Sequence, residues 1–324
     1  MTRKTEKLRL LSQIILTGKN PAKLRAACLE LYDLFSEITG FDDSDKSSEI
    51  QNGTLLPTGK AISPINAARC LWDFKRTYEF LRAVRAAITE LKNRFPHEKI
   101  EILYAGCGPF APLIVPLLDK LSPAEINLTL LDYHAPSIAV VKRIFEKLNY
   151  DEFNAVFIQT DAACYKHPRE IQLVICETMQ STLAKETQTA ITLNLAPQLC
   201  ERGIFLPEKI SVEVCMVNLP KESGERERIN LGRIFELEAE KIRQNPLLDF
   251  PRTALKIPAQ AKGRNLCFMI LTKVLIFDSF RLDDYDSAIT YPKHLSPKPD
   301  IEASEILEFF YSFGEKPHFE YKSV

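Results

Sequence analysis

Residues 100–111 read IEILYAGCGPFA, and this stretch decides the fold. The apolar run at its start has the length and composition of a buried parallel strand. Gly106 and Gly108 follow in a G-x-G-x-x-A turn, which lets the backbone approach a ligand closely before the chain enters a helix. The stretch therefore predicts the first strand and turn of a domain that binds a ligand at one edge of its sheet.

Short apolar runs alternate with helical segments after this turn. We expect strands at LTLLDY, AVFIQTD and LVICE, and helices near residues 111–121, 136–148 and 185–202. Such alternation is typical of a parallel sheet with crossover helices. The expected fold class is α/β, with a Rossmann-like sheet, N-terminal helices and a C-terminal antiparallel β extension.

The N-terminal region has a helical pattern. Apolar residues recur at helical spacing from residue 8 to residue 35, and a Gly-Lys-Asn-Pro break between them predicts a helical hairpin. The polar, turn-rich stretch 42–60 is expected to be a loop or linker, and it could serve as a lid. A long helix is expected from Ser63 to about Arg94, with Pro64 in its first turn.

Longer strand-like runs after Gly203 predict a β-rich C-terminal part. The charged stretch at residues 220–246 between these runs is expected to be a solvated helix or loop. We therefore divide the chain into an N-terminal helical segment and linker at residues 1–60, a cofactor-binding sheet domain at residues 61–208, and a β-rich closing domain at residues 209–324.

Composition narrows the functional classes. A chain of 324 residues, 45% hydrophobic and 26% charged, can bury a full core. Its net charge of -1 provides no overall basic field, so we expect no nucleic-acid partner. No apolar run approaches the roughly 20 residues of a membrane span, and we expect a cytoplasmic protein without a membrane partner. The eight cysteines show no C-x-x-C spacing, which argues against a metal site and against a disulfide framework.

Two of the expected strands end in acidic residues. Asp132 lies 21 residues beyond Ala111, where a carboxylate can accept both hydroxyls of a ribose. Asp161 ends the next strand and is placed for an adenine amino group. With the glycine turn, these acids fit a dinucleotide enzyme and an S-adenosylmethionine enzyme about equally, and a plain strand-turn-helix with chance acids is the alternative.

Two glutamates nine residues apart, Glu177 and Glu186, frame the segment that follows the fourth expected strand. A strand that ends in a carboxylate and a helix that begins with a second one can direct both groups at one point. The planar guanidinium group matches two carboxylates better than an ammonium does. The pair therefore indicates a guanidinium site, unless both acids only mark a solvated strand end and helix start.

The helix before the first strand gives the decisive pattern. Asp73, Arg76, Thr77 and Phe80 stand in the order D-x-x-R-T-x-x-F. This order resembles the cofactor-covering helix of the protein arginine methyltransferase family. The same family has two glutamates nine residues apart with a Met two positions after the first, and Met179 stands there in this chain. The resemblance covers about residues 60–215, including GIFLP at its end.

The resemblance implies a class I S-adenosylmethionine-dependent methyltransferase that transfers a methyl group to a guanidino nitrogen. It implies that Arg76 binds the carboxylate of S-adenosylmethionine and that Met179 packs beside the reactive nitrogen. The residues expected to bind the cofactor are Arg76, Gly106, Gly108, Asp132 and Asp161, and those expected at the reaction centre are Glu177, Glu186 and Met179.

Departures from the family pattern concern the substrate. The family has Ser-Glu-Trp-Met-Gly around the first glutamate, whereas this chain has CETMQ at residues 176–180. The family's Thr-His-Trp loop has only a loose counterpart in TYP at residues 290–292, with His294 nearby. The N-terminal helices and a short C-terminal part favour a closed pocket, as in bacterial arginine N-methyltransferases that act on small molecules. We therefore expect free L-arginine or a related small guanidine as substrate.

Other interpretations stay open. The acceptor could be an arginine within a peptide or another small amine, or the chain could be a non-catalytic interaction protein with a cofactor fold. The family resemblance also implies a homodimer. The leucine-rich helices at residues 8–38 are the candidate interface, unless they pack on their own domain.

Overall fold

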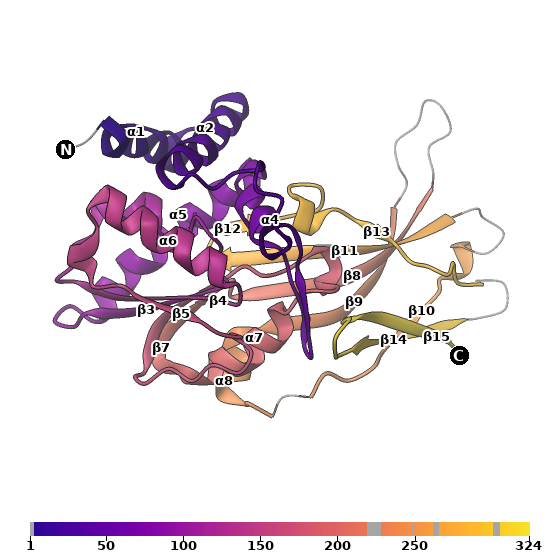
Figure 1. Cartoon of the computed structure of the whole chain (residues 1–324). Helices are drawn as coiled ribbons and strands as arrows, with labels where there is room; N and C mark the ends of the chain where they lie inside the picture. The colour runs from indigo at the N-terminus through magenta and orange to yellow at the C-terminus, as the bar shows by residue number, and fades with distance from the viewer. Residues whose placement is uncertain (1–2, 219–227, 248, 262–265, 301–304) are drawn as a thin grey trace.

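The computed structural model describes residues 3–218, 228–247, 249–261, 266–300 and 305–324. Its centre is a five-stranded parallel sheet with the strand order β5-β4-β3-β6-β7 (Figure 1). The bounds of its strands are β3 Ile100–Ala105, β4 Ile126–Asp132, β5 Val156–Gln159, β6 Ile171–Cys176 and β7 Leu199–Leu206. The α/β class and the Rossmann-like sheet are thereby confirmed.

The register of this sheet aligns the ends of its three middle strands. Ala105, the last residue of β3, pairs with Leu131 of β4 and with Cys176 of β6. Because the strands are parallel, the residues that follow them leave the sheet at the same edge. Gly106, Asp132 at the end of β4, and Glu177 therefore lie side by side at this edge.

The prediction of one continuous helix from residue 63 to residue 94 is wrong, because the segment is interrupted. It is divided into α4 (Pro64–Arg69), a 3-10 turn (Cys70–Trp72) and α5 (Phe74–Arg94). Asp73 has non-helical backbone angles and its Oδ1 accepts a hydrogen bond of 3.3 Å from the backbone N–H of Arg76. Asp73 is thus a second N-cap inside the segment, and a new helix begins there.

Two other expected helices are shorter than predicted. Residues 111–121 form only a 3-10 helix at Val115–Lys120, preceded by Ala111 with a positive φ of 40°. The expected helix at residues 185–202 shrinks to α7 (Gln188–Leu195) and a 3-10 turn (Ala196–Gln198). Prolines inside both segments remove backbone donors that a longer α-helix needs. The expected helix at residues 136–148 is confirmed as α6 (Ala135–Leu148).

The C-terminal part is antiparallel, as predicted. One sheet has the order β12-β11-β8-β9, with β13 also paired to β11, and a second sheet has the order β10-β14-β15. The bounds are β8 Lys209–Asn218, β9 Arg228–Glu238, α8 Ala239–Gln244, β10 Thr253–Lys256, β11 Leu266–Phe277, β12 Phe280–Leu282, β13 Lys293–His294, β14 Ile306–Ser312 and β15 His318–Ser323. The remaining 3-10 turns are Asp151–Phe153, Ser181–Leu183, Ala259–Ala261 and Ala288–Thr290.

The expectation of a helix or loop at residues 220–246 is wrong for Arg228–Glu238, which forms strand β9 and pairs with β8 along its length, and right for Ala239–Gln244, which is helix α8. The register between β9 and β8 shifts at two places, and these shifts interrupt the alternation of a regular strand. Residues 219–227 lie outside the described residues.

The N-terminal helical hairpin is confirmed, and it packs on its own chain. It consists of α1 (Arg3–Thr17) and α2 (Pro21–Thr39), which lie over α5 and α6 (Figure 1). Phe35 of α2 is fully buried, and its ring centre lies 5.4 Å from that of Phe110 in the turn after β3. The apolar face of the hairpin is thus occupied within the chain, and the homodimer stays a prediction without support from this face.

A hairpin of strands lies in the stretch that was expected to be a linker. Residues 42–60 contain α3 (Ser48–Gln51) and β1 (Thr54–Leu56), and β2 (Gly59–Ala61) completes an antiparallel pair with β1. In the part of the chain that the structure describes, no helix combines the length and the apolar character that a bilayer crossing demands.

Phe35→Ala is expected to lower the free energy of unfolding by about 3–5 kcal/mol, because it leaves a cavity against Phe110. Leu10→Ala, on the 61% exposed side of the same hairpin, is the control and should change it by less than about 0.5 kcal/mol. Urea unfolding measures both variants. Equal small effects would contradict the packing of the hairpin on the sheet domain.

Candidate functional site

A cavity with about 900 Å³ of empty space, open solvent included, lies at the carboxyl edge of the parallel sheet. This position is typical of small-molecule sites in α/β proteins. Seven of the eight predicted site residues line it: Arg76, Gly106, Gly108, Asp132, Asp161, Glu177 and Glu186. The eighth, Met179, lines a neighbouring cavity.

The glycine turn forms the floor of this cavity. Gly106 and Gly108 have positive φ angles of 68° and 62°, which favour glycine. A β-carbon at Gly106 would collide with Cγ2 of Thr178, and one at Gly108 would lie 3.3 Å from the β-carbon of Ala67 in α4. The turn needs both glycines because the loops on either side approach its backbone closely.

Asp132 joins the second strand to this turn. Its Oδ2 accepts a hydrogen bond of 2.9 Å from the backbone N–H of Gly108, and its Oδ1 accepts one of 2.8 Å from the N–H of His134. Burial raises the pKa of this carboxyl group, and the two N–H donors oppose the shift. Each oxygen keeps a further lone pair, so the carboxylate can still accept hydroxyl groups of a ligand.

Two other groups on this side of the cavity are open to a ligand. Asp161 accepts a hydrogen bond of 2.9 Å from the N–H of Ala163 through Oδ1. The Nε2 of His134 is buried and has no hydrogen-bond partner among the described residues. A buried polar atom without a partner is costly, and a ligand in the cavity would remove that cost.

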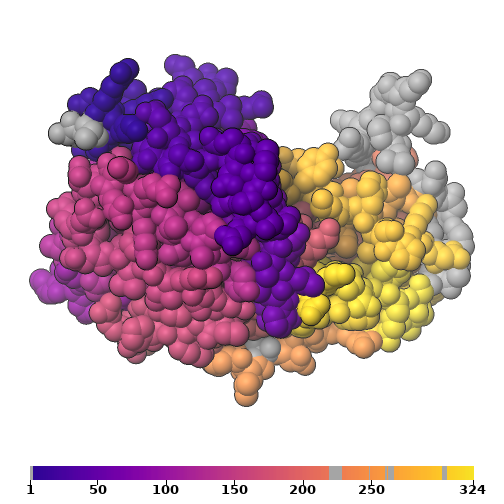
Figure 2. Space-filling view, viewed as in Figure 1, coloured from indigo at the N-terminus to yellow at the C-terminus, as the bar shows by residue number. Residues whose placement is uncertain are grey.

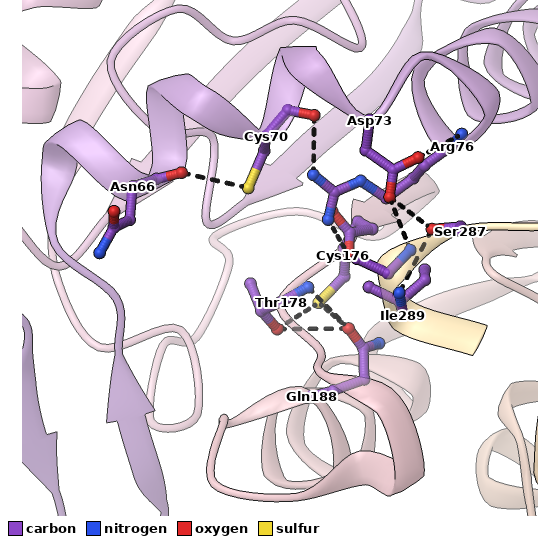
Figure 3. Close-up of polar contacts among 11 residues, drawn as sticks. Asn66, Cys70, Asp73, Arg76, Cys176, Thr178, Gln188, Ser287 and Ile289 are labelled. Carbon is purple, nitrogen blue, oxygen red and sulfur yellow. Dashed lines mark hydrogen bonds and ion pairs between the residues drawn. The ribbon is translucent and has the colours of Figure 1, made fainter. Parts of the chain in front are cut away.

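Arg76 and Glu177 form a buried ion pair between the first turn of α5 and the end of β6. The Nη1 atom of Arg76 lies 3.2 Å from Oε2 of Glu177, and the Nη2 atom donates a hydrogen bond of 2.9 Å to the carbonyl of Cys70. Figure 3 shows the guanidinium reaching from α5 toward Cys70, with the Thr178 and Gln188 contacts below it. The Oε1 of Gln188 accepts from the N–H of Thr178 at 2.9 Å and holds the loop after Glu177 in place.

Glu186 faces the same cavity from the other end of this loop. Burial raises the pKa of Glu177 to about 7, and the neighbouring Glu186 adds to the shift while Arg76 opposes it. Burial also raises the pKa of Glu186 to about 7, against the effects of Gln180, Arg76 and Lys60. Near neutral pH the site therefore holds fewer than two negative charges until a cation enters, and a cation would favour ionisation of both acids.

The loop that carries Glu186 has a strained backbone. Thr182, Leu183 and Lys185 have positive φ angles of 66°, 51° and 69°, which are unfavourable for residues with a β-carbon. The C-terminal part holds this backbone in place. The N–H of Thr182 donates to Oγ1 of Thr272 at 2.7 Å, and the hydroxyl of Tyr311 donates to the carbonyl of Leu183 at 2.7 Å. Strands far along the sequence thus fix the position of Glu186.

The hairpin of β1 and β2 covers the large cavity. Leu56, Lys60, Ala61 and Ile62 line it, and the N–H of Lys60 donates a hydrogen bond of 2.6 Å to the carbonyl of Lys185. Figure 2 shows this purple segment running between the magenta sheet domain and the yellow C-terminal strands. The polar stretch that was expected to be a linker or lid lies over the site.

A second cavity, of about 790 Å³, lies on the other side of Arg76. Cys70, Arg76 and Glu186 line both cavities. Met179 and Gln180 line the second cavity, together with Ala288, Ile289 and Lys293 from the C-terminal part. Two adjoining spaces with shared charged walls can hold two ligands whose reacting atoms meet near Glu186.

The C-terminal segment at residues 287–294 borders the second cavity and is bonded to Asp73, the residue that caps α5. The Oδ2 atom of Asp73 accepts hydrogen bonds from the hydroxyl of Ser287 at 2.7 Å and from the N–H of Ala288 at 2.9 Å (Figure 3). Ser181 donates to the carbonyl of Tyr291 at 2.6 Å. His294 is exposed on β13 and lines neither cavity.

The sequence patterns did not reveal several residues of the site. The cover formed by Leu56 and Lys60 had one signal, the Pro-Thr-Gly turn between two short apolar pairs. Cys70 and His134 had none, because their places depend on folding of distant segments. Among the described residues, no cluster of histidine, cysteine, aspartate and glutamate could bind a metal ion.

Comparisons with known proteins show which fold the chain shares with solved structures. No protein-family model matches the chain, and no curated protein matches it. The solved enzyme-prozyme heterotetramer of protein arginine methyltransferase 1 from Trypanosoma brucei, a complex with S-adenosylhomocysteine, is similar with a TM-score of 0.54 at 14% identity, over 79% of this chain and 93% of that chain. Protein arginine methyltransferase 10 of Arabidopsis thaliana, in an open conformation, gives 0.49 at 11% identity, over 71% and 84%. The first likeness shows a methyltransferase-type fold.

Gly106→Ala is expected to destabilise the protein more than Gly40→Ala, by about 1–3 kcal/mol, because only the first substitution meets a neighbour. The two glycines share a φ of 68°, and no atom lies within 4 Å of a β-carbon at Gly40. Both variants therefore bear the same left-handed penalty of about 1–2 kcal/mol. Thr178→Ser should recover the excess loss in Gly106→Ala, as measured by urea unfolding. Equal losses at the two glycines would contradict the close approach of Thr178.

Proposed function

We propose that the chain is an S-adenosylmethionine-dependent N-methyltransferase that acts on a guanidino group, with free L-arginine or a related small guanidine as its substrate. The observation that carries this proposal is the position of Glu177 and Glu186. Two buried carboxyl groups with raised pKa values face a cavity whose floor is a glycine turn. The methyltransferase-type fold agrees with it.

The residues of the large cavity fit S-adenosylmethionine. The close backbone of Gly106 and Gly108 leaves room for the ligand, and Asp132 has lone pairs for the ribose hydroxyls. Asp161 is available for the adenine amino group, and His134 offers a buried nitrogen that has no partner in the described chain. Arg76 is the cation for the methionine carboxylate. When bound, S-adenosylmethionine supplies an electrophilic methyl group.

Glu177 and Glu186 orient the acceptor. A guanidinium between them would be held by charge-assisted hydrogen bonds, which fix one nitrogen toward the cofactor and draw positive charge toward the acids. The ion pair with Arg76 holds the side chain of Glu177 in one orientation, so its carboxylate does not have to reorient when the substrate binds. Glu186 has no cation paired to it within the described residues and can take the proton that leaves the methylated nitrogen.

Met179 and Gln180 shape the acceptor space. Met179 is 3% exposed and lines the second cavity, where it can limit how many methyl groups fit on the reacting nitrogen. With the cofactor in the large cavity and the acceptor in the second one, Cys70, Arg76 and Glu186 form the shared wall. The guanidinium must reach this wall to meet Glu177, which lines only the large cavity.

The direct test is incubation of the purified protein with labelled S-adenosylmethionine and, in parallel, free L-arginine and an arginine-rich peptide. Mass spectrometry of both products should show methylated free arginine. Methylation of the peptide alone would replace the small-molecule substrate with a protein substrate. Cofactor binding without either product would favour another acceptor or a non-catalytic role.

Glu186→Gln is expected to reduce methyl transfer by at least about 100-fold, because the neutral amide removes one of the charges that orient the acceptor. Its affinity for S-adenosylmethionine, measured by calorimetry, should stay within about threefold of the wild type. Glu30→Gln on the exposed surface of α2 is the matched control. Unchanged turnover of the Glu186 variant would rule out the two-glutamate clamp.

The value of kcat/KM for arginine is expected to rise about 100-fold between pH 6 and pH 8, about tenfold for each of the two acids. The pKa values of Glu177 and Glu186 are both raised to about 7, so the acids are largely protonated at the lower pH and ionised at the higher one. The guanidinium stays charged throughout, and its binding requires the ionised acids. Initial rates across this range check the profile, and a flat profile would contradict it.

A further inference from the structure

The second cavity has a buried acidic end and an exposed rim. Met179 and Glu186 at the inner end are 3% and 8% exposed. Asn66, Gln180, Ala288 and Lys293 are exposed side chains around its opening. A molecule in this cavity therefore has one end among buried acids and its other end near solvent.

Two cations stand at the rim. Lys293 lies on β13 at the register position opposite Ile270 of β11, and its ammonium group has no hydrogen-bond or ion-pair partner in the described ranges. Arg69 lies on α4 and also lines this cavity. Its Nη2 atom is 3.0 Å from Oδ2 of Asp43 and its Nη1 atom donates a hydrogen bond of 3.3 Å to Asn66, so its charge is already paired, although its buried Nε atom has no partner among the described residues.

Among the described residues, Asp73 is the one carboxylate that lines the rim, and both of its oxygens already accept hydrogen bonds. Asp73 accepts hydrogen bonds through Oδ1 from Arg76 and through Oδ2 from Ser287 and Ala288. Lys293 is therefore the cation at the opening that has no partner among the described residues, while Glu186 is the acid at the inner end that has no paired cation there. This polarity is opposite to what an arginine flanked by other basic residues would need.

We propose that the rim of the second cavity recognises a carboxylate on the acceptor, with Lys293 as the group that binds it. The acceptor class is a guanidine that carries its own carboxylate, as an α-amino acid does. This inference rests on the proposed function and deepens it. Glu186 selects the guanidinium end at the inner end of the cavity, and Lys293 selects the opposite end at the rim.

Most exposed lysines contact only water. If Lys293 does the same, its substitution would not change the preference of the enzyme for one acceptor over another. The comparison of L-arginine with L-argininamide separates the two cases. The two molecules share the guanidine and the chain length, but argininamide has a neutral amide in place of the carboxylate. A rim that binds the carboxylate would favour arginine over argininamide, whereas a rim that contacts only water would treat the two molecules alike.

The experiment measures kcat and KM of the full chain for both acceptors at a saturating concentration of S-adenosylmethionine. In Lys293→Gln, the ratio of kcat/KM for arginine to that for argininamide should fall about fivefold, the upper range for an exposed ion pair. The loss should lie in KM for arginine, because a rim contact holds the acceptor equally in the ground state and the transition state. Lys293→Glu should lower the ratio further, and Lys23→Gln, an exposed lysine on α2, should leave it unchanged.

The outcomes separate this inference from the proposed function. A wild-type enzyme that methylates arginine and argininamide equally, or a ratio that is the same in Lys293→Gln, overturns the rim recognition and leaves guanidine methylation standing. The absence of methyl transfer to any guanidine, including a peptidyl arginine, overturns both. Preference for arginine that is lost in both Lys293 variants and kept in Lys23→Gln supports the inference.

Discussion

The buried ion pair of Arg76 with Glu177 is the interaction on which the site depends. It joins the start of α5 to the end of β6, and the same guanidinium holds the carbonyl of Cys70. A charge buried at this depth is stable only with its partner, and removal of one member of such a pair typically costs about 3–5 kcal/mol. Because Arg76 stands between the two cavities, the pair also fixes the boundary between them.

The electrostatics of the site carry a cost in the free protein. Glu177 and Glu186 are buried near each other, and burial raises the pKa of both acids. A guanidinium ligand would favour ionisation of both and so relieve the repulsion that the fold imposes. Stability and function thus oppose each other at this loop, where three residues with β-carbons also have left-handed backbone angles.

The sequence predicted those parts of the fold that local patterns control. The alternation of apolar runs with helical segments from residue 100 onward predicted the parallel sheet, and parallel register then places Asp132 and Glu177 next to Gly106. The predicted continuous helix failed at Asp73, where one short acidic side chain caps a new helix. Strand β9 was missed because two register shifts interrupt its alternation. The Pro-Thr-Gly turn indicates the hairpin of β1 and β2, but its position over the site could not be read from local sequence, because that position is set by contact with a loop more than a hundred residues later.

The hydrogen bond from the N–H of Lys60 to the carbonyl of Lys185 joins the cover of the large cavity to the loop that carries Glu186, which lines both cavities. A β-carbon at Gly59 would lie 2.8 Å from the backbone of Glu186, so the cover and this loop are in close contact. Under the proposed function, a cover that opened to admit the cofactor would break this bond next to Glu186. Two ligands that both favoured the closed cover would then strengthen each other's binding by the same factor.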